Sequence, residues 1–221
     1  MPDRLPLFPL ETVLFPDMVL PLHVFEPRYR KLFAERSDCD PTFGVVLAQS
    51  GREVGEQPDI HEVGTAATLL EAIKYADGRV DLAVRGGHRF RVLEGNWDAS
   101  CLVAELEWLP DVAAEAPRDK AIRLAEDVKR AFAAYLDAVE RAAGQAIAPL
   151  EFGGGPAAVA YAVCAAMPFG TAERQRLLEA SDLRLLLDEL LLVLRRERDL
   201  LLATGIGGAA ISHPGRRFST N

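Results

Sequence analysis

Residues capable of catalysis are present in this chain, but their spacing does not reproduce the common catalytic or metal-binding motifs. His61 and Glu62 begin like the zinc-binding sequence HExxH, yet Thr65 stands where the second histidine is required. The phosphate-binding loop GxxxxGK[ST] and the nucleophile turn GxSxG are both absent from the sequence. The sequence therefore predicts no catalytic residues, no metal site and no cofactor.

A serine–lysine catalytic pair needs no local motif, because its members come together only in the folded protein. The sequence gives little support for such a pair, since each lysine lies in a polar stretch typical of solvated surface: Lys31, Lys74, Lys120 and Lys129. We therefore expect a protein that is not an enzyme, and an uncharacterised hydrolase stays an alternative.

The charge of the chain bears on nucleic-acid binding, which depends mainly on lysine and arginine neutralising phosphates. Residues 1–110 hold 11 basic and 18 acidic side chains, a net charge of −7, and the whole chain carries −8. A local basic cluster interrupts this acidic region: Arg79, Arg85, His88, Arg89 and Arg91. We interpret the cluster as a solvated sheet face paired with nearby acids, and a basic binding patch is the other interpretation.

The three cysteines, Cys39, Cys101 and Cys164, lie far apart and form no CxxC pair, so no zinc site or disulfide framework is predicted. A reducing cytoplasm fits this usage. The N-terminus lacks the features of a secretory signal, and no window has the run of uncharged apolar residues that a membrane span needs. We expect a cytoplasmic protein without membrane association.

The first element that must position any site is the opening segment, residues 5–32, in which prolines interrupt apolar stretches at short intervals. Proline removes a backbone donor and keeps its neighbour extended, so the segment favours short edge strands and bends. Pro27 suits a first helical turn, and Tyr29, Leu32 and Phe33 follow at helical spacing. The segment therefore predicts strands followed by one early helix.

The rest of the chain divides by its periodicity. Residues 1–110 end in short alternating strands, with a hairpin turn at Asp77-Gly78 and a break at Gly86-Gly87, which predicts a closed or partly closed barrel. Residues 111–117 read as a linker, residues 118–203 as a helical bundle with apolar residues at helical spacing, and residues 204–221 as a flexible tail.

Several short motifs follow one another in an order that one known family shares: Phe43-Gly44-Val45-Val46, Glu62-Val63-Gly64-Thr65, Gly87-His88-Arg89-Phe90-Arg91-Val92 and Ala166-Met167-Pro168. With the opening segment, they resemble the amino-terminal substrate-binding domain of the ATP-dependent Lon (La) proteases, from residue 5 to about residue 200. The chain looks most like the free-standing versions, which carry no ATPase or protease domain. The glycine run at 153–155 and the basic tail have no counterpart that we can place in the family.

This resemblance implies an α+β fold, with a PUA-like β pseudo-barrel that contains one early helix, followed by a C-terminal α-helical bundle. It also implies a non-catalytic module that binds unfolded or extended polypeptide segments and assists protein quality control or proteolysis, with a protease or chaperone as a further partner. RNA or nucleotide binding through the PUA-like barrel is the alternative, against which the negative charge argues.

The resemblance connects the start of the early helix with substrate contact, and there the planar guanidinium of Arg28 suits a carboxylate or a peptide carbonyl. The predicted peptide-binding residues are Phe25, Glu26, Arg28, Tyr29, Arg89 and Phe90. The structural interpretation, which we favour, is that Glu26 caps the helix or pairs with Arg89, while Phe25 and Tyr29 pack in the core.

Overall fold

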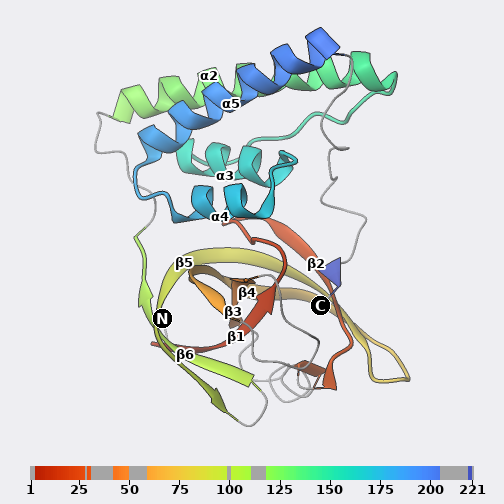
Figure 1. The fold of residues 1–221 in the computed structure, drawn as a ribbon, viewed down its shortest axis with the longest axis vertical. Helices are drawn as coiled ribbons and strands as arrows, with labels where there is room; N and C mark the ends of the chain where they lie inside the picture. The colour runs from red at the N-terminus through yellow and green to blue at the C-terminus, as the bar shows by residue number, and fades with distance from the viewer. Residues whose placement is uncertain are drawn as a thin grey trace. The chain divides into compact units, whose positions relative to one another are not determined.

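The computed structural model describes residues 3–27, 29–30, 42–49, 59–98, 101–110, 118–204 and 219–220. Its strands are β1 (Arg4–Leu10), β2 (Val19–Val24), β3 (Thr42–Ala48), β4 (Ile60–Lys74), β5 (Val80–Asp98), β6 (Cys101–Trp108) and β7 (Ser219–Thr220). Its helices are α2 (Arg118–Ala143), α3 (Pro156–Ala166), α4 (Thr171–Glu179) and α5 (Leu183–Thr204). Contacts divide these elements into a β unit, which holds the strands and residues 171–178 of α4, and a helical unit, which holds α2, α3 and α5 (Figure 1).

The strands of the β unit pair in the order β4-β3-β1-β6-β5, and β4 also pairs with β5, so the described strands close into a ring of five. Outside this ring, β2 pairs antiparallel with the first part of β5, and β7 pairs with β2. Closing a sheet on itself removes free strand edges. The mixed sheet and the helices fit the predicted α+β class, whereas the PUA-like character and the C-terminal bundle remain predictions.

The turn at Asp77-Gly78 joins β4 to β5, as the sequence predicts. Gly78 has a φ of +85°, a conformation that favours glycine, and the Tyr75 N–H donates to the Arg79 carbonyl at 2.9 Å across the turn. Strands β4 and β5 pair over most of their length, and their ladder is the longest in the β unit.

The break expected at Gly86-Gly87 is wrong, because both residues lie inside the continuous strand β5. A glycine is required at position 86 because another part of the backbone approaches closely there, and not because the chain turns. A Cβ atom on Gly86 would lie 2.1 Å from the carbonyl oxygen of Phe15, and the Gly86 N–H donates to the Met18 carbonyl at 2.9 Å. The loop between β1 and β2 therefore packs directly against the backbone of β5 at Gly86.

Two apolar clusters fill the β unit. Phe90 lies fully buried in one of them, where a Cβ atom on Gly44 or on Gly64 would lie 2.7 Å from its ring. Its other members are Leu5, Leu7, Val46, Ala66, Leu102, Ala104 and Leu106. The second cluster consists of Phe8, Leu10, Leu14, Leu20, Leu22, Val24, Tyr29, Phe43, Val45, Ala67, Val80, Leu82 and Val84.

Helix α4 belongs with the strands for most of its length. The Gln175 side-chain amide donates to the Val63 carbonyl in β4 at 3.0 Å, and the Arg89 guanidinium donates to the Leu178 carbonyl near the end of the helix at 2.7 Å. The division of the chain therefore differs from the sequence-based one, which assigns residues 118–203 to one helical bundle. Amphipathic spacing shows that a helix buries one face, but it does not show against which partner.

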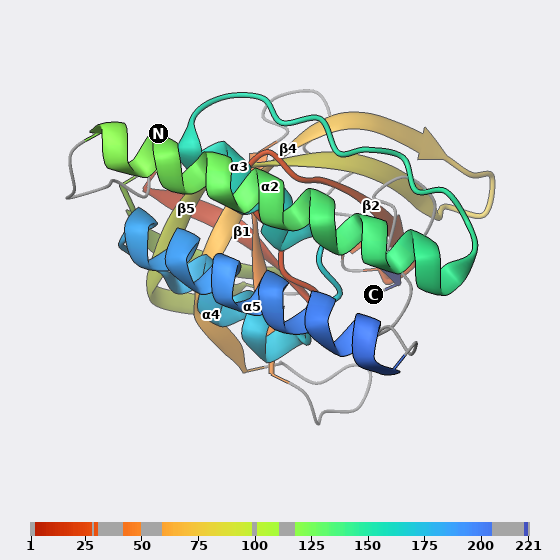
Figure 2. The ribbon, with the colours of Figure 1, turned by 90° about the horizontal axis from the view of Figure 1, so that it is seen from above.

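The helical unit packs α2 along α5, with α3 in contact with both (Figure 2). Its boundaries follow local chemistry: Gly144, with a φ of +66°, follows the last turn of α2, and Pro156 begins α3. The Asp182 carboxylate accepts from the N–H of Arg184 at 2.7 Å and thereby caps α5. Among the described helices, none has the length and apolar character that crossing a membrane would require.

Candidate functional site

Two of the predicted peptide-binding residues, Tyr29 and Phe90, lie in the interior of the β unit. Tyr29 is buried, and its ring centroid lies 4.3 Å from that of Phe8 in an edge-to-face contact. Phe90 is buried and makes an edge-to-face contact with Trp108 at 6.2 Å. Both rings therefore support the core and do not present a surface to a partner.

Arg89 is also buried, and its guanidinium holds backbone groups together. It donates to the Leu178 carbonyl at 2.7 Å and to the Pro110 carbonyl at 3.1 Å. Carbonyls near the end of a helix lack partners within the helix, so a cation placed there satisfies them and matches the helix dipole. The position of Arg89 is that of a residue that fastens α4 to the strands.

Two further predicted residues, Phe25 and Glu26, follow the end of β2. Phe25 follows the strand and is 39% exposed, and the Glu26 carbonyl accepts from the N–H groups of Tyr29 and Arg30 at 3.1 and 3.0 Å. Arg28 lies outside the described residues. Among the predicted residues that the structure describes, Phe25 is the one whose apolar side chain is exposed, so the favoured placement of Phe25 in the core is wrong.

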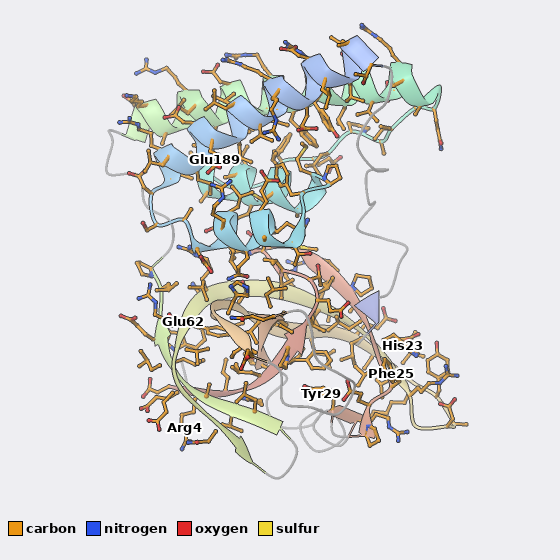
Figure 3. All side chains as sticks on the ribbon, viewed as in Figure 1. Arg4, His23, Phe25, Tyr29, Glu62 and Glu189 are labelled. Atoms are coloured by element: carbon orange, nitrogen blue, oxygen red, sulfur yellow. The ribbon has the colours of Figure 1, made fainter. Side chains whose placement is uncertain are left out.

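Phe25 does not stand alone, because the strand register brings further exposed apolar side chains to the same face. His23 in β2, Asp81 in β5 and Ile73 in β4 are register partners, so their side chains point to one side of the sheet. The Phe25 ring stacks on the His23 ring at 6.3 Å, and Figure 3 shows these two side chains together at the end of β2. Phe25, Ile73 and Tyr75, which are 39%, 50% and 43% exposed, form what we call the hairpin patch.

A polar network underlies the hairpin patch. His23 Nδ1 lies 2.5 Å from one carboxylate oxygen of Asp81, and the Tyr75 hydroxyl donates to the other oxygen at 2.6 Å. The hydrogen bond from Tyr75 holds the pKa of the Asp81 carboxyl below its ordinary value, against the opposing effect of burial, and the same bond raises the pKa of Tyr75. The exposed Tyr75 ring is thus fixed at its polar end.

The turn beyond the patch is ordered by arginine. The Arg79 guanidinium donates to the Asp77 carboxylate at 2.8 Å and lies 5.7 Å from the centre of the Tyr75 ring. Arg30 donates to the Asp77 carbonyl at 3.0 Å. Backbone donation from Arg79 lowers the pKa of the Asp77 carboxyl. The patch therefore rests on a hairpin whose turn is held from two sides.

Sequence reasoning did not identify His23, Ile73, Tyr75 or Asp81 as members of one site. The available signal was weak: Ile73 and Tyr75 are apolar residues on the outward side of a strand beside a turn. Their proximity to Phe25 depends on the pairing of β2 with β5, between residues about sixty positions apart in the chain. In the residues that the structure describes, no group of three or more histidine, cysteine or acidic side chains is arranged to hold a metal ion.

The basic cluster of the sequence is divided by the fold. Arg79 and Arg91 are exposed but form ion pairs with Asp77 and Glu107 at 2.8 and 3.2 Å. Arg89 is buried and Arg85 is exposed. The arginines therefore do not form one continuous basic surface, whereas the hairpin patch presents exposed apolar side chains on one sheet face.

The sequence of this chain is similar to that of Lon proteases over most of its length. The profile of the "ATP-dependent protease La (LON) substrate-binding domain" family matches residues 4–196. Lon protease 2 of Syntrophobacter fumaroxidans is 28% identical over 210 residues, which cover 91% of this chain and 25% of that protein. Lon protease of Escherichia coli K12 is 27% identical over 201 residues, which cover 90% of this chain and 25% of that protein.

Solved structures agree with the sequence comparison. The crystal structure of a Lon N-terminal domain protein from Xanthomonas campestris superposes with a TM-score of 0.61 at 27% identity, and covers 86% of this chain and 97% of that one. The N-terminal domain of Mycobacterium avium complex Lon protease, at 21% identity and a TM-score of 0.61, shares the fold. The chain spans about a quarter of the length of the curated relatives that it matches. It belongs to the Lon (La) substrate-binding domain family.

Proposed function

We propose that this chain is a non-catalytic module that binds exposed apolar or extended segments of unfolded polypeptides, in the service of protein quality control or proteolysis. Membership of a substrate-binding family supports the class of ligand. The observation that carries the proposal is the hairpin patch, where three large apolar side chains are exposed on one sheet face, at the ends of β2 and β4, which both pair with β5. Exposed apolar groups gathered in one place are typical of interaction sites.

The order of the patch supports binding to extended segments of varied sequence. Phe25 is stacked on His23, and Tyr75 is hydrogen-bonded to Asp81, so little freedom is lost when a ligand covers them. Flat aromatic and aliphatic surface recognises apolar character and not a particular side chain, because apolar burial is non-directional. The ligand class is therefore a polypeptide whose apolar side chains are not buried in a fold of its own.

The proposal is tested by replacing Ile73 with serine and measuring binding of a reduced, alkylated and permanently unfolded model protein by fluorescence anisotropy. Because fully burying an isoleucine side chain contributes about 1.5–3 kcal/mol, we expect affinity to fall roughly tenfold. The matched control is Leu93→Ser, which removes an exposed apolar side chain from β5 outside the patch. Equal affinities of the two variants, both folded by circular dichroism, would contradict the placement of the site.

RNA binding through the barrel is the competing function, and the arrangement of charge weighs against it. Of the arginines on the hairpin, Arg79 and Arg91 are already paired with acids, and Arg89 is buried. Binding to a phosphate backbone depends on cations that are free to replace counterions. Arg85 is exposed and is the position at which a residual contribution of this kind can be tested.

A further inference from the structure

Strand β2 uses its two edges differently. One edge pairs with β5 over all six residues, from Val19 to Val24. The other edge pairs in parallel with β7, at Leu22 with Ser219 and at His23 with Thr220 (Figure 1). Strand β7 comes from residues 219–220, whereas the other described strands of this sheet all come from residues before 110.

This edge adjoins the hairpin patch. His23 is the backbone partner of Thr220, and its side chain stacks on Phe25 and contacts the Asp81 carboxylate. A polypeptide that lies along the β2 edge therefore passes Phe25, the member of the patch that follows β2. Strand addition to a free edge is a general way to bind extended peptides, with backbone hydrogen bonds for affinity and alternate side chains for selectivity.

The contact made by β7 has the character of a displaceable occupant. It spans two residues of β2, and the described part of the chain shows no other strand on the remaining positions of that edge. Pro21 in β2 has no N–H to donate, which limits how long a ladder this edge can form. One hydrogen bond makes a net contribution of only about 0.5–1.5 kcal/mol to stability. A ladder as short as this one can therefore be readily replaced by another segment.

Charge favours the return of the C-terminal segment to this unit. Arg216 and Arg217 stand just before β7 in the sequence, whereas residues 1–110 carry a net charge of −7. The attraction is screened by salt and acts as a bias, not as a specific contact. The segment Arg216–Thr220 thus combines a basic start with a short extended end.

We propose that the C-terminal strand β7 is an intramolecular occupant of the β2 edge that competes with extended polypeptides for the same backbone groups. This inference rests on the proposed function. It adds a mode of binding, which is strand addition to β2, and a form of regulation, which is autoinhibition by β7. A ligand must displace β7, so its apparent affinity is reduced by the fraction of molecules in which the edge is occupied.

The test uses the full chain in two matched forms, Ser219→Pro with Thr220→Pro, and Ser219→Ala with Thr220→Ala. Proline removes the backbone donors of β7, whereas alanine keeps them, and neither pair changes a residue of the patch. The probes are the unfolded model protein and a labelled synthetic peptide with the sequence of residues 214–221, added in trans. We expect the proline form to bind both probes about three- to tenfold more tightly than the alanine form, which should match the unmodified protein.

The two probes separate the inference from the function on which it rests. If the proline form captures the trans peptide but neither form binds the unfolded protein, the tail occupies the edge and the proposed function fails. If both forms bind the unfolded protein equally, or the trans peptide fails to distinguish them, the inference is overturned. It is likewise overturned if the proline form only self-associates in sedimentation velocity without capturing the peptide, since β7 then merely covers an edge.

Discussion

Asp81 is the residue that couples the hairpin patch to the rest of the sheet. Its two carboxylate oxygens face His23 and Tyr75, which come from different strand ends and each carry or support an exposed ring. A carboxylate accepts hydrogen bonds better than a neutral carboxyl group, so both contacts favour its ionised form. The order of the patch therefore depends on one titratable group.

This coupling predicts that acid destabilises the β unit through Asp81. The pKa of its carboxyl is lowered in the folded protein from 3.8, so its contribution to stability is present above that value. The contribution is lost as the pH falls through the lower folded-state pKa. We expect the free energy of unfolding, measured with urea at steps between about pH 5 and pH 2.5, to fall less steeply in Asp81→Asn than in the unmodified protein.

Glu107→Gln provides the control for this prediction, because Glu107 is an exposed partner of Arg91. Exposed ion pairs contribute little to stability, so its acid profile should follow that of the unmodified protein. Parallel profiles for the Asp81 variant and the unmodified protein would show that the polar network does not stabilise the fold.

At the scale of an element, helix α4 is likewise held by polar contacts, which connect it to the strands. Gln175 reaches the Val63 carbonyl, and Arg174 lies 5.1 Å from the centre of the Phe15 ring. Arg89 reaches the helix from β5. These contacts explain why a helix of nine residues, which is too short to be stable alone, is fixed at this place.

Arg89→Met is therefore expected to lower stability without being a direct test of binding. The change leaves the carbonyls of Leu178 and Pro110 without this donor, and it should cost about 2–4 kcal/mol of unfolding free energy in chemical denaturation. The matched control is Arg91→Met, two positions along the same strand, where the side chain is exposed and the cost should be about 0.5 kcal/mol or less. Intact stability with lost polypeptide binding in the Arg89 variant would restore its predicted role as a ligand contact.

The elements show which properties a sequence reveals. Local signals were sufficient for the hairpin turn at Asp77-Gly78, because the turn depends on a few neighbouring residues. The continuity of β5 through Gly86 was missed, since a glycine needed for a close backbone approach looks the same as one needed for a turn. The partner of α4 was missed because it depends on contacts between distant segments.

The same limit applies to the candidate site. The sequence favours a core position for Phe25, whereas its side chain is exposed, and its role in binding stays a prediction. The helical spacing of Tyr29 favours a core position, and the side chains of Tyr29 and Phe90 are both buried. Ile73, Tyr75 and the polar network join Phe25 only through the register of three strands, and no local pattern encodes that register.

At the scale of the whole molecule, the distribution of charge separates the two functions under consideration. The chain carries a net charge of −8, and its exposed arginines on the hairpin are largely paired with acids. Binding through apolar surface depends weakly on salt, whereas binding through phosphates weakens steeply as salt rises. The salt dependence of binding is therefore a property by which the ligand class can be recognised before the ligand is known.

We expect the affinity for the unfolded model protein to change less than about twofold between 50 and 300 mM NaCl, because apolar burial is not screened by ions. In the same titration a single-stranded RNA should not be retained at about 150 mM NaCl, since the exposed hairpin arginines Arg79 and Arg91 are already paired with acids. The control is Arg85→Glu, which removes the exposed arginine of β5 and should leave polypeptide affinity unchanged. Two results together would contradict polypeptide binding and favour nucleic-acid binding. These are RNA retention that disappears in this variant, and a tenfold loss of affinity for the unfolded protein across the salt range.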